Sequence, residues 1–258
     1  MSLPPRDSPG FATTLGVVAI VLWASTVAFG RSLSAQLGPL SAAAAVYVVS
    51  AVFSLCVLIS RPARVRGVLR LPPRYLVVCG TLFVVYAICL YLALGLASGS
   101  QQAIEVGTIN YLWPAATVVL AVPILGQRAR WTIVPGTCAA LAGIILATMP
   151  PGQWSSGIFI DTLRTNGLPY VLALVAALDW ALYSNLSRRW AGGAGAGAVP
   201  LFMVITALVM VPLALLQPVD EVRWSARLIL ELVYLGLFPT ALAYAFWAAF
   251  HPPEFATH

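Results

Sequence analysis

Long apolar stretches alternate with short polar connections along almost the whole chain. A helix that crosses the hydrocarbon core of a bilayer needs roughly 20 apolar residues. Eight stretches meet this length, at residues 11–30, 40–59, 75–97, 101–125, 131–149, 169–187, 199–216 and 228–250. The connections are short apart from the polar stretch 150–168. The pattern predicts an all-α protein that passes through the membrane several times.

The fourth stretch, 101–125, carries a proline near its middle. Pro114 cannot donate a hydrogen bond to the carbonyl of Asn110, and its ring crowds that carbonyl. We therefore expect a kink here that leaves a backbone oxygen free. Inside a bilayer such an oxygen is tolerated only where protein or a water-filled cavity satisfies it. Because Asn110, Tyr111 and Trp113 cluster at the kink, the stretch predicts a site for a polar ligand with an apolar body.

Composition supports an integral membrane protein. Of 258 residues, 60% are hydrophobic and 9% are charged, whereas a soluble domain has about 25% charged residues. The cysteines Cys56, Cys79, Cys89 and Cys138 all fall in apolar stretches and are interpreted as small core residues. The histidines, His251 and His258, lie outside the predicted spans, so we expect no metal and no cofactor.

The net charge of +6 comes from arginine and indicates orientation rather than nucleic-acid binding. Cytoplasmic loops of membrane proteins are enriched in basic residues. With the N-terminus inside, the cytoplasmic segments hold Arg6, Arg61, Arg64, Arg66, Arg70, Arg74, Arg128, Arg130, Arg188 and Arg189, and the outer ones hold Arg31, Arg164, Arg223 and Arg227. This bias of ten to four predicts a cytoplasmic N-terminus.

The first and sixth stretches repeat one pattern. The first places Gly16, Ala19, Trp23, Thr26 and Gly30 on one face before Arg31, and the sixth places Ala173, Ala176, Trp180, Tyr183 and Ser187 on one face before Arg188. The offset is 157 residues throughout. Two packed membrane helices with small residues can look alike without a repeat. If the repeat is real, five helices separate the copies, so the halves have opposite orientations, as in secondary transporters.

The second copy is shorter than the first. The predicted organisation is a cytoplasmic tail (1–10), a first five-helix repeat (11–149), an extracytoplasmic linker (150–168), an incomplete three-helix repeat (169–250) and a polar tail (251–258). A five-helix repeat would need two further helices, which the polar tail cannot begin.

Residues 102–114 read QAIEVGTINYLWP, which closely resembles the fourth helix of YddG-type amino-acid exporters in the EamA branch of the drug/metabolite transporter superfamily. The runs AIVLWAST at 19–26 and YAICL at 86–90 are also similar to that family. The resemblance implies ten helices in two inverted five-helix repeats, and export of aromatic and other neutral amino acids. It also implies a bacterial inner membrane and a monomer that meets lipid and a small-molecule substrate.

Helical spacing of 100° per residue places Gln102, Val106, Asn110, Trp113 and Thr117 on one face of the fourth stretch. We expect this face to line the substrate cavity. Trp113 could instead belong to an interfacial belt, and Asn110 could simply join two helices. With the aromatic residues of other stretches, the substrate-binding candidates are Trp23, Tyr86, Gln102, Asn110, Tyr111, Trp113, Trp180 and Tyr183.

Aromatic residues recur in several other stretches, at Tyr47, Tyr91 and Tyr244 among them. Most rings of this kind only pack. Trp23 and Trp180 are stronger candidates because the repeat relates them. Rings that face a polar cavity can stack on an aromatic substrate or hold its ammonium over a π face.

Two acidic residues within the stretches are candidates for a proton-linked or a structural role. Glu105 lies in the first turns of its helix, where a carboxylate suits the positive end of the dipole, and it points away from Asn110. Asp179 lies nearer the middle of its helix, where a carboxylate should be paired or protonated. The chain has no lysine to pair with it, so proton coupling through Asp179 is a hypothesis.

The main functional hypothesis is a secondary transporter that exports amino acids by alternating access. The clearly apolar stretches lack a central arginine or lysine, which disfavours phosphates and nucleotide sugars. The alternatives are an exporter of other small metabolites or drugs on the same fold, and a truncated chain that does not transport. An intramembrane enzyme is disfavoured, because the sequence has no H-E-x-x-H, no G-x-S-x-G and no paired intramembrane aspartates.

Overall fold

A computed structural model describes residues 9–127, 133–148, 161, 163–217 and 222–250. The described residues are helical with short turns and contain no strand. The helices are α1 (Pro9–Leu37), α2 (Pro39–Ser60), α3 (Pro62–Leu69), α4 (Pro73–Leu96), α5 (Ser100–Asn110), α6 (Trp113–Leu125), α7 (Ile133–Thr148), α9 (Leu168–Ala191), η1 (Gly192–Ala198), α10 (Val199–Leu215), α11 (Ala226–Leu237), η2 (Phe238–Leu242) and α12 (Ala243–Phe250). The predicted tail 251–258 and most of the predicted segments 1–10 and 150–168 lie outside the described residues.

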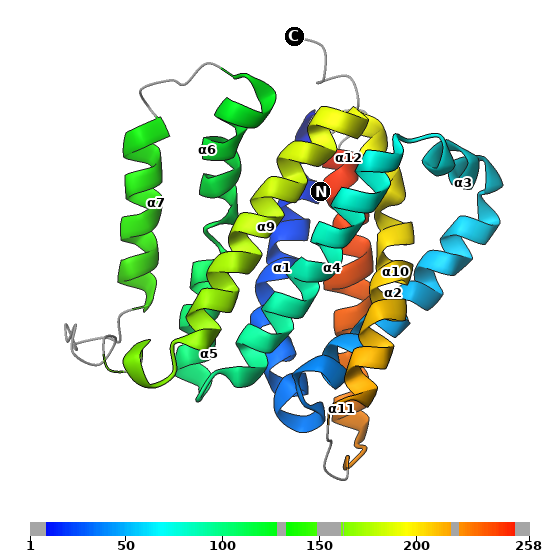
Figure 1. Cartoon of the computed structure of the whole chain (residues 1–258). Helices are drawn as coiled ribbons and strands as arrows, with labels where there is room; N and C mark the ends of the chain where they lie inside the picture. The colour runs from blue at the N-terminus through cyan, green and yellow to red at the C-terminus, as the bar shows by residue number, and fades with distance from the viewer. Residues whose placement is uncertain (1–8, 128–132, 149–160, 162, 218–221, 251–258) are drawn as a thin grey trace.

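Six described stretches are long and apolar enough to cross a membrane: Thr13–Leu37, Pro39–Ser60, Pro73–Leu96, Ser100–Leu125, Leu168–Leu215 and Ala226–Trp247. The protein is therefore a multi-pass membrane protein. The stretch of 48 residues turns back on itself at the 3-10 helix η1, so α9 and α10 run in opposite directions, and α4 packs against both of them (Figure 1). α7, with 16 residues, stands at the edge of the bundle and contacts α5 and α6.

Prolines mark the starts of many of these helices. The first turn of α2, α3, α4, α6, α9 and α10 each contains one, because a proline there loses no intrahelical hydrogen bond and its φ suits a helix. Gly38, with φ 79°, connects α1 to α2, and Gly126, with φ 66°, ends α6. These turns keep the connections short, as the sequence indicated.

Two helix ends and one additional helix differ from the prediction. The first helix was expected to end at Gly30 but continues to Leu37, so Arg31 lies inside it and donates to the carbonyls of Leu94 and Gly95 at the end of α4. Arg188 likewise lies inside α9. The short helix α3 was not predicted. It lies across one end of the bundle (Figure 1), and its eight residues are too few to cross a membrane.

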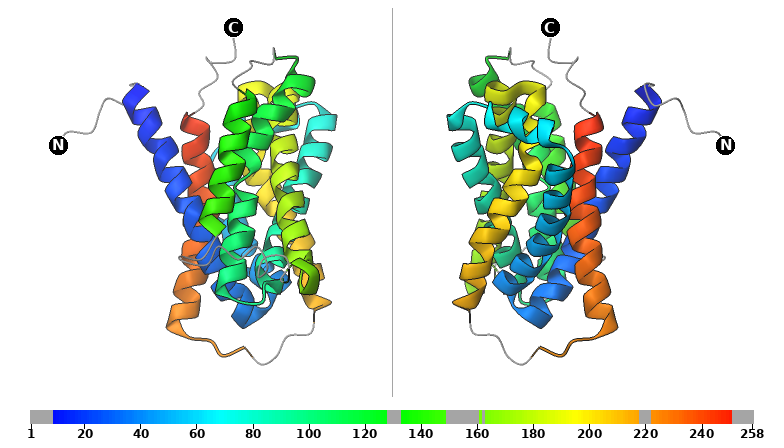
Figure 2. Two further views of the ribbon diagram at one scale, coloured as in Figure 1. Left: turned by 90° about the vertical axis from the view of Figure 1, so that its left-hand side faces the viewer. Right: turned by 90° about the vertical axis from the view of Figure 1, so that its right-hand side faces the viewer.

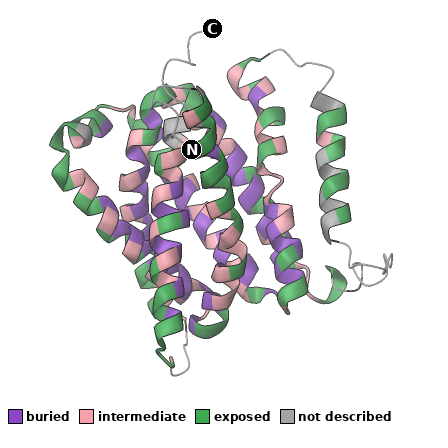
Figure 3. Cartoon of the chain, turned by 180° about the vertical axis from the view of Figure 1, so that it is seen from behind, coloured by how far each residue is buried: buried purple, intermediate pink, exposed green. Residues whose placement is uncertain are grey.

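Buried residues line the inner sides of the helices, and exposed residues cover much of the outer surface (Figure 3). Tyr75, Phe83 and Phe202 are fully buried, whereas Val21 and Leu208 on α1 and α10 are mostly exposed. Surface apolar residues on this scale mark a surface that contacts lipid or protein. α1 begins and α12 ends on the same side of the bundle, and the two helices pack against each other (Figure 2).

A candidate substrate pocket

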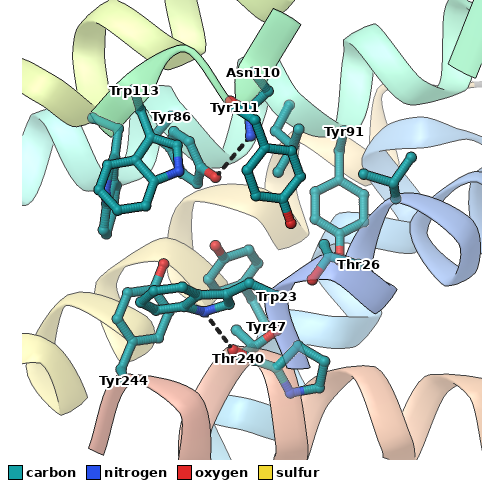
Figure 4. Close-up of a pocket in the computed structure, with 14 residues that line it drawn as sticks. Trp23, Thr26, Tyr47, Tyr86, Tyr91, Asn110, Tyr111, Trp113, Thr240 and Tyr244 are labelled. Atoms are coloured by element: carbon teal, nitrogen blue, oxygen red, sulfur yellow. Dashed lines mark hydrogen bonds between the residues drawn. The ribbon is translucent and has the colours of Figure 1, made fainter. Parts of the chain in front are cut away.

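A pocket lies between α1, α2, α4, the α5–α6 junction, α9 and the last helical segment (Figure 4). Its empty volume is about 660 Å³ with its open mouth included. The lining residues are Trp23, Thr26, Val27, Tyr47, Tyr86, Leu90, Tyr91, Asn110, Tyr111, Trp113, Trp180, Pro239, Thr240 and Tyr244. Eight of the described helical elements (α1, α2, α4, α5, α6, α9, η2 and α12) thus meet at one cavity.

One wall is the junction between α5 and α6. α5 ends at Asn110 and α6 begins at Trp113, so the helix is interrupted at Tyr111 and Leu112, directly before Pro114. The amide N–H of Tyr111 donates to the Gly107 carbonyl and that of Leu112 to the Ile109 carbonyl, at 3.1 and 3.0 Å. The interruption turns the side chains of Asn110, Tyr111 and Trp113 toward the cavity (Figure 4).

A second interruption forms another part of the wall. Residues Phe238–Leu242 form a π-helical turn between α11 and α12, a feature often found at functional sites. The Thr240 hydroxyl donates to the carbonyl of Leu235, five residues earlier, at 2.8 Å. The indole N–H of Trp23 on α1 donates to the Pro239 carbonyl at 3.1 Å. Irregular backbone within an apolar helix is thereby satisfied by a residue that also lines the pocket.

Aromatic rings form most of the remaining wall. The Trp23 ring lies edge-on to the rings of Trp113 and Tyr244, with centroids 6.4 and 5.3 Å away. The Trp180 ring lies 4.8 Å from the Tyr86 ring. Rings at these separations stabilise one another beyond simple burial, so the pocket has a preformed aromatic surface.

Polar groups are few and uncharged. The amide nitrogen of Asn110 donates to the Tyr86 hydroxyl at 3.4 Å, and its oxygen, fully buried, has no hydrogen-bond partner among the described residues. The other polar groups are threonine and tyrosine hydroxyls and tryptophan indole N–H groups. No charged side chain occurs among the described residues of the lining. The pocket can therefore hold a ligand that is apolar and aromatic over most of its surface and carries no net charge.

Six of the eight predicted substrate-binding residues lie together in the lining: Trp23, Tyr86, Asn110, Tyr111, Trp113 and Trp180. Gln102 and Tyr183 do not. The Gln102 amide oxygen accepts from the Ser98 hydroxyl at 2.9 Å, and its nitrogen donates to the Asn166 carbonyl at 2.8 Å, so it ties the start of α5 to the start of α9. Tyr183 packs against Phe83 in the adjacent core.

Neither acidic candidate lines the pocket. Glu105 accepts hydrogen bonds from the Tyr170 hydroxyl and, at 3.2 Å, from the Gln101 amide, and so joins α5 to α9. Asp179 is buried beside Trp180, and one of its carboxylate oxygens has no hydrogen-bond partner among the described residues.

Sequence reasoning did not select several lining residues. Tyr47, Tyr91 and Tyr244 were recognised only as recurrent aromatics, and Thr240 was not considered. A signal for Thr240 exists, because Pro239 interrupts the last apolar stretch much as Pro114 interrupts the fourth. No local pattern distinguishes Tyr47, whose position depends on how α2 packs.

Comparison with known proteins identifies the family to which this chain is similar. The pattern that defines the EamA-like transporter family matches residues 10–149. The chain is similar to the aromatic amino acid exporter YddG of Salmonella typhimurium and to that of Escherichia coli, at 36% identity over 92% of this chain and 78% of each relative. The YddG of Ancylobacter novellus is 28% identical over the same shares. One solved crystal structure superposes with a TM-score of 0.69 at 27% identity, covering 95% of this chain and 80% of the other.

Proposed function

This chain belongs to the EamA-like transporter family, and we propose that it exports aromatic and other neutral amino acids by alternating access. The relatives named as aromatic amino acid exporters support this substrate class. So does the pocket, which combines eight tyrosine and tryptophan rings in its lining with no charged side chain among the described lining residues. On this reading the protein is a transporter and not an enzyme.

The observation that carries the proposal is the match between this lining and a zwitterion. An aromatic amino acid has no net charge, so a charged side chain in the site is not required to balance it. Its ring would lie among Trp23, Trp113 and Trp180, and its ammonium and carboxylate would meet π faces, hydroxyl groups and the Asn110 amide. Phosphates and nucleotide sugars would need basic residues that this lining lacks.

Helix packing supports a transporter built from two inverted halves with eight crossing segments. In the proposed repeat, α1 corresponds to α9 and α4 corresponds to the α11–α12 segment. α1 packs along α12, and α9 packs along α4. If the two halves are exchanged, the first of these helix pairs becomes the second, as a repeat requires. The pocket lies where these two pairs meet, as expected for a site between repeats.

The proposed orientation has the N-terminus in the cytoplasm of a bacterium and the chain in the inner membrane. The arginine bias supports it. On this reading α3 and its arginines lie at the cytoplasmic surface, and the turns after α1, α4 and α10 lie on the outer side.

Counterflow of labelled phenylalanine into proteoliposomes tests the function. Trp113→Ala removes one aromatic wall, and we expect the apparent affinity to fall about tenfold, since tenfold corresponds to about 1.4 kcal/mol, the scale of one aromatic contact. Trp190→Ala is the matched control, because that indole lies under the Arg74 guanidinium, outside the pocket. Equal losses in both variants, or absence of phenylalanine exchange in the unaltered protein, would contradict the proposal.

An exporter of cationic aromatic drugs is the second candidate, favoured by the same rings, since tryptophan faces also attract cations. Competition separates the two candidates. Excess unlabelled phenylalanine should block counterflow of the label far better than a cationic dye does, and the reverse order would favour the drug exporter.

A further inference from the structure

Asp179 is a buried acid that the pocket itself does not use. It lies on α9, one residue before the pocket residue Trp180, and only 9% of it is exposed. Its Oδ2 atom is fully buried without a hydrogen-bond partner among the described residues. The ion pair found in the described part of the chain joins Arg227 and Glu231, on a different helix. Among the described residues, no cation pairs with the Asp179 carboxylate.

Contacts between α9 and the interrupted helix α5–α6 show which residues of that helix lie beside Asp179. Asn166 pairs with Gln102 and Tyr170 with Glu105, at sequence separations of 64 and 65. Further along, the Asn185 amide donates to the Thr117 carbonyl at a separation of 68, and Arg189 donates to the Ile124 carbonyl at a separation of 65.

These separations place Asp179 level with residues 111–115. That is the interruption between α5 and α6, at Tyr111 and Leu112. The acid thus lies beside the least regular part of the helix that forms one wall of the pocket.

The titratable groups around Asp179 belong to three neighbouring elements. On α4, the Tyr86 hydroxyl and the Cys89 thiol interact with it electrostatically. At the α5–α6 junction, Tyr111 interacts with the same Tyr86 hydroxyl. On α5, Glu105 lies further off, level with Tyr170 and not with Asp179, and is held by its hydrogen bonds with Tyr170 and Gln101. None of these groups is a cation.

Tyr86 links the acid to the pocket. Its ring contacts Trp180 and lines the cavity, and its hydroxyl accepts from the Asn110 amide. A change of charge on Asp179 would be felt directly by this hydroxyl, and through it by the amide at the helix interruption.

An ionised carboxylate that is buried without a partner is strongly unfavourable, and such a group takes up a proton instead. Resting on the transport function proposed above, we infer that Asp179 is the proton-binding site of this transporter, and that its proton is exchanged for the substrate. A proton from the water on one side forms the O–H bond of the neutral acid. The bond breaks when the proton leaves to the other side, so one positive charge crosses for each zwitterion moved the opposite way.

Proteoliposomes that are acidic inside, with the membrane potential clamped, test this exchange. Protons that leave should drive labelled phenylalanine inward above its outside concentration. Asp179→Asn imitates the neutral acid but cannot release a proton, so it should abolish this accumulation. Glu105→Gln is the matched control, since it changes a second buried acid at a position engaged by hydrogen bonds, and it should accumulate the label as the unaltered protein does.

Two results would overturn the inference: accumulation that persists in Asp179→Asn, or unaltered protein that exchanges phenylalanine in counterflow and ignores the proton gradient. Absence of counterflow would instead count against the proposed function. Infrared spectroscopy then tests the proton site without any substrate. The spectrum of the unaltered protein should contain the carbonyl band of a protonated carboxylic acid that Asp179→Asn removes and Glu105→Gln does not. If no such band is lost with Asp179, the acid holds no proton and the inference fails.

Discussion

The contact between Gly107 of α5 and Val27 of α1 sets how closely the broken helix approaches the first helix. A methyl group added at Gly107 would lie 2.6 Å from Cγ2 and 2.8 Å from Cγ1 of Val27. Carbon atoms that are not bonded normally stand about 3.5–4.0 Å apart. Gly107→Ala must therefore push α5 and α1 apart by about 1 Å, and Val27 lines the pocket.

Overpacking of this kind costs about 1–3 kcal/mol, and the better helix propensity of alanine returns about 1 kcal/mol. We expect Gly107→Ala to lower the free energy of unfolding by up to about 2 kcal/mol. Val27→Ala removes both clashing carbons and leaves its Cβ at 3.3 Å from the added methyl. The double variant should therefore lose less unfolding free energy than the sum of the losses in the two single variants, and this difference, the coupling energy, should be about 1–3 kcal/mol.

Thermal unfolding of the detergent-solubilised protein measures the stability of all three variants, and phenylalanine counterflow measures the pocket. The matched control is Gly143→Ala on α7, where an added Cβ meets nothing within 4 Å, so it should be neutral or stabilising. If Gly107→Ala behaves like Gly143→Ala, or if the effects of the two changes in the double variant are additive, the Gly107–Val27 contact does not limit how closely α5 and α1 approach.

Two further substitutions test hydrogen bonds around the pocket. Trp23→Phe keeps a ring but removes the donor to the Pro239 carbonyl. We expect the free energy of unfolding to fall by about 1–3 kcal/mol and phenylalanine binding to weaken, as measured by thermal unfolding and counterflow. Unchanged stability would contradict this role. Tyr170→Phe removes the hydroxyl that donates to Glu105, so the unfolding temperature should fall while the apparent affinity for phenylalanine stays the same, and an affinity change would show that this pair reaches the pocket.

Sequence patterns predicted the helices well because membrane spans depend on local hydrophobicity. The expected stretches correspond to the described helices within a few residues, apart from the extension of α1 to Leu37. The site near Pro114 was predictable for a similar reason, since the missing hydrogen bond of a proline is local chemistry. The inverted repeat depends on an offset between two stretches and remains a proposal.

Helical periodicity gave the face of a residue but not its depth. Gln102 shares a face with Asn110, yet eight residues at 1.5 Å each separate them by about 12 Å along the axis, which places Gln102 at the end of the helix beside Asn166. Tyr183 follows Trp180 by one turn, and its ring meets Phe83 and Phe202 instead of the cavity. Depth and lateral neighbours depend on packing between segments far apart in the chain.

The two irregular turns explain why the pocket forms where it does. Each interrupts an apolar helix, and each exposes backbone polar groups that lipid cannot satisfy. Such turns are stable only if they face each other or a shared cavity, and both do so here. Trp23 secures the turn at Pro239 by its indole N–H, whereas the turn after Asn110 is held by backbone hydrogen bonds within its own segment. The turn after Asn110 carries Asn110, Tyr111 and Trp113, and the π-helical turn carries Pro239 and Thr240, so the two interruptions together supply five of the lining residues.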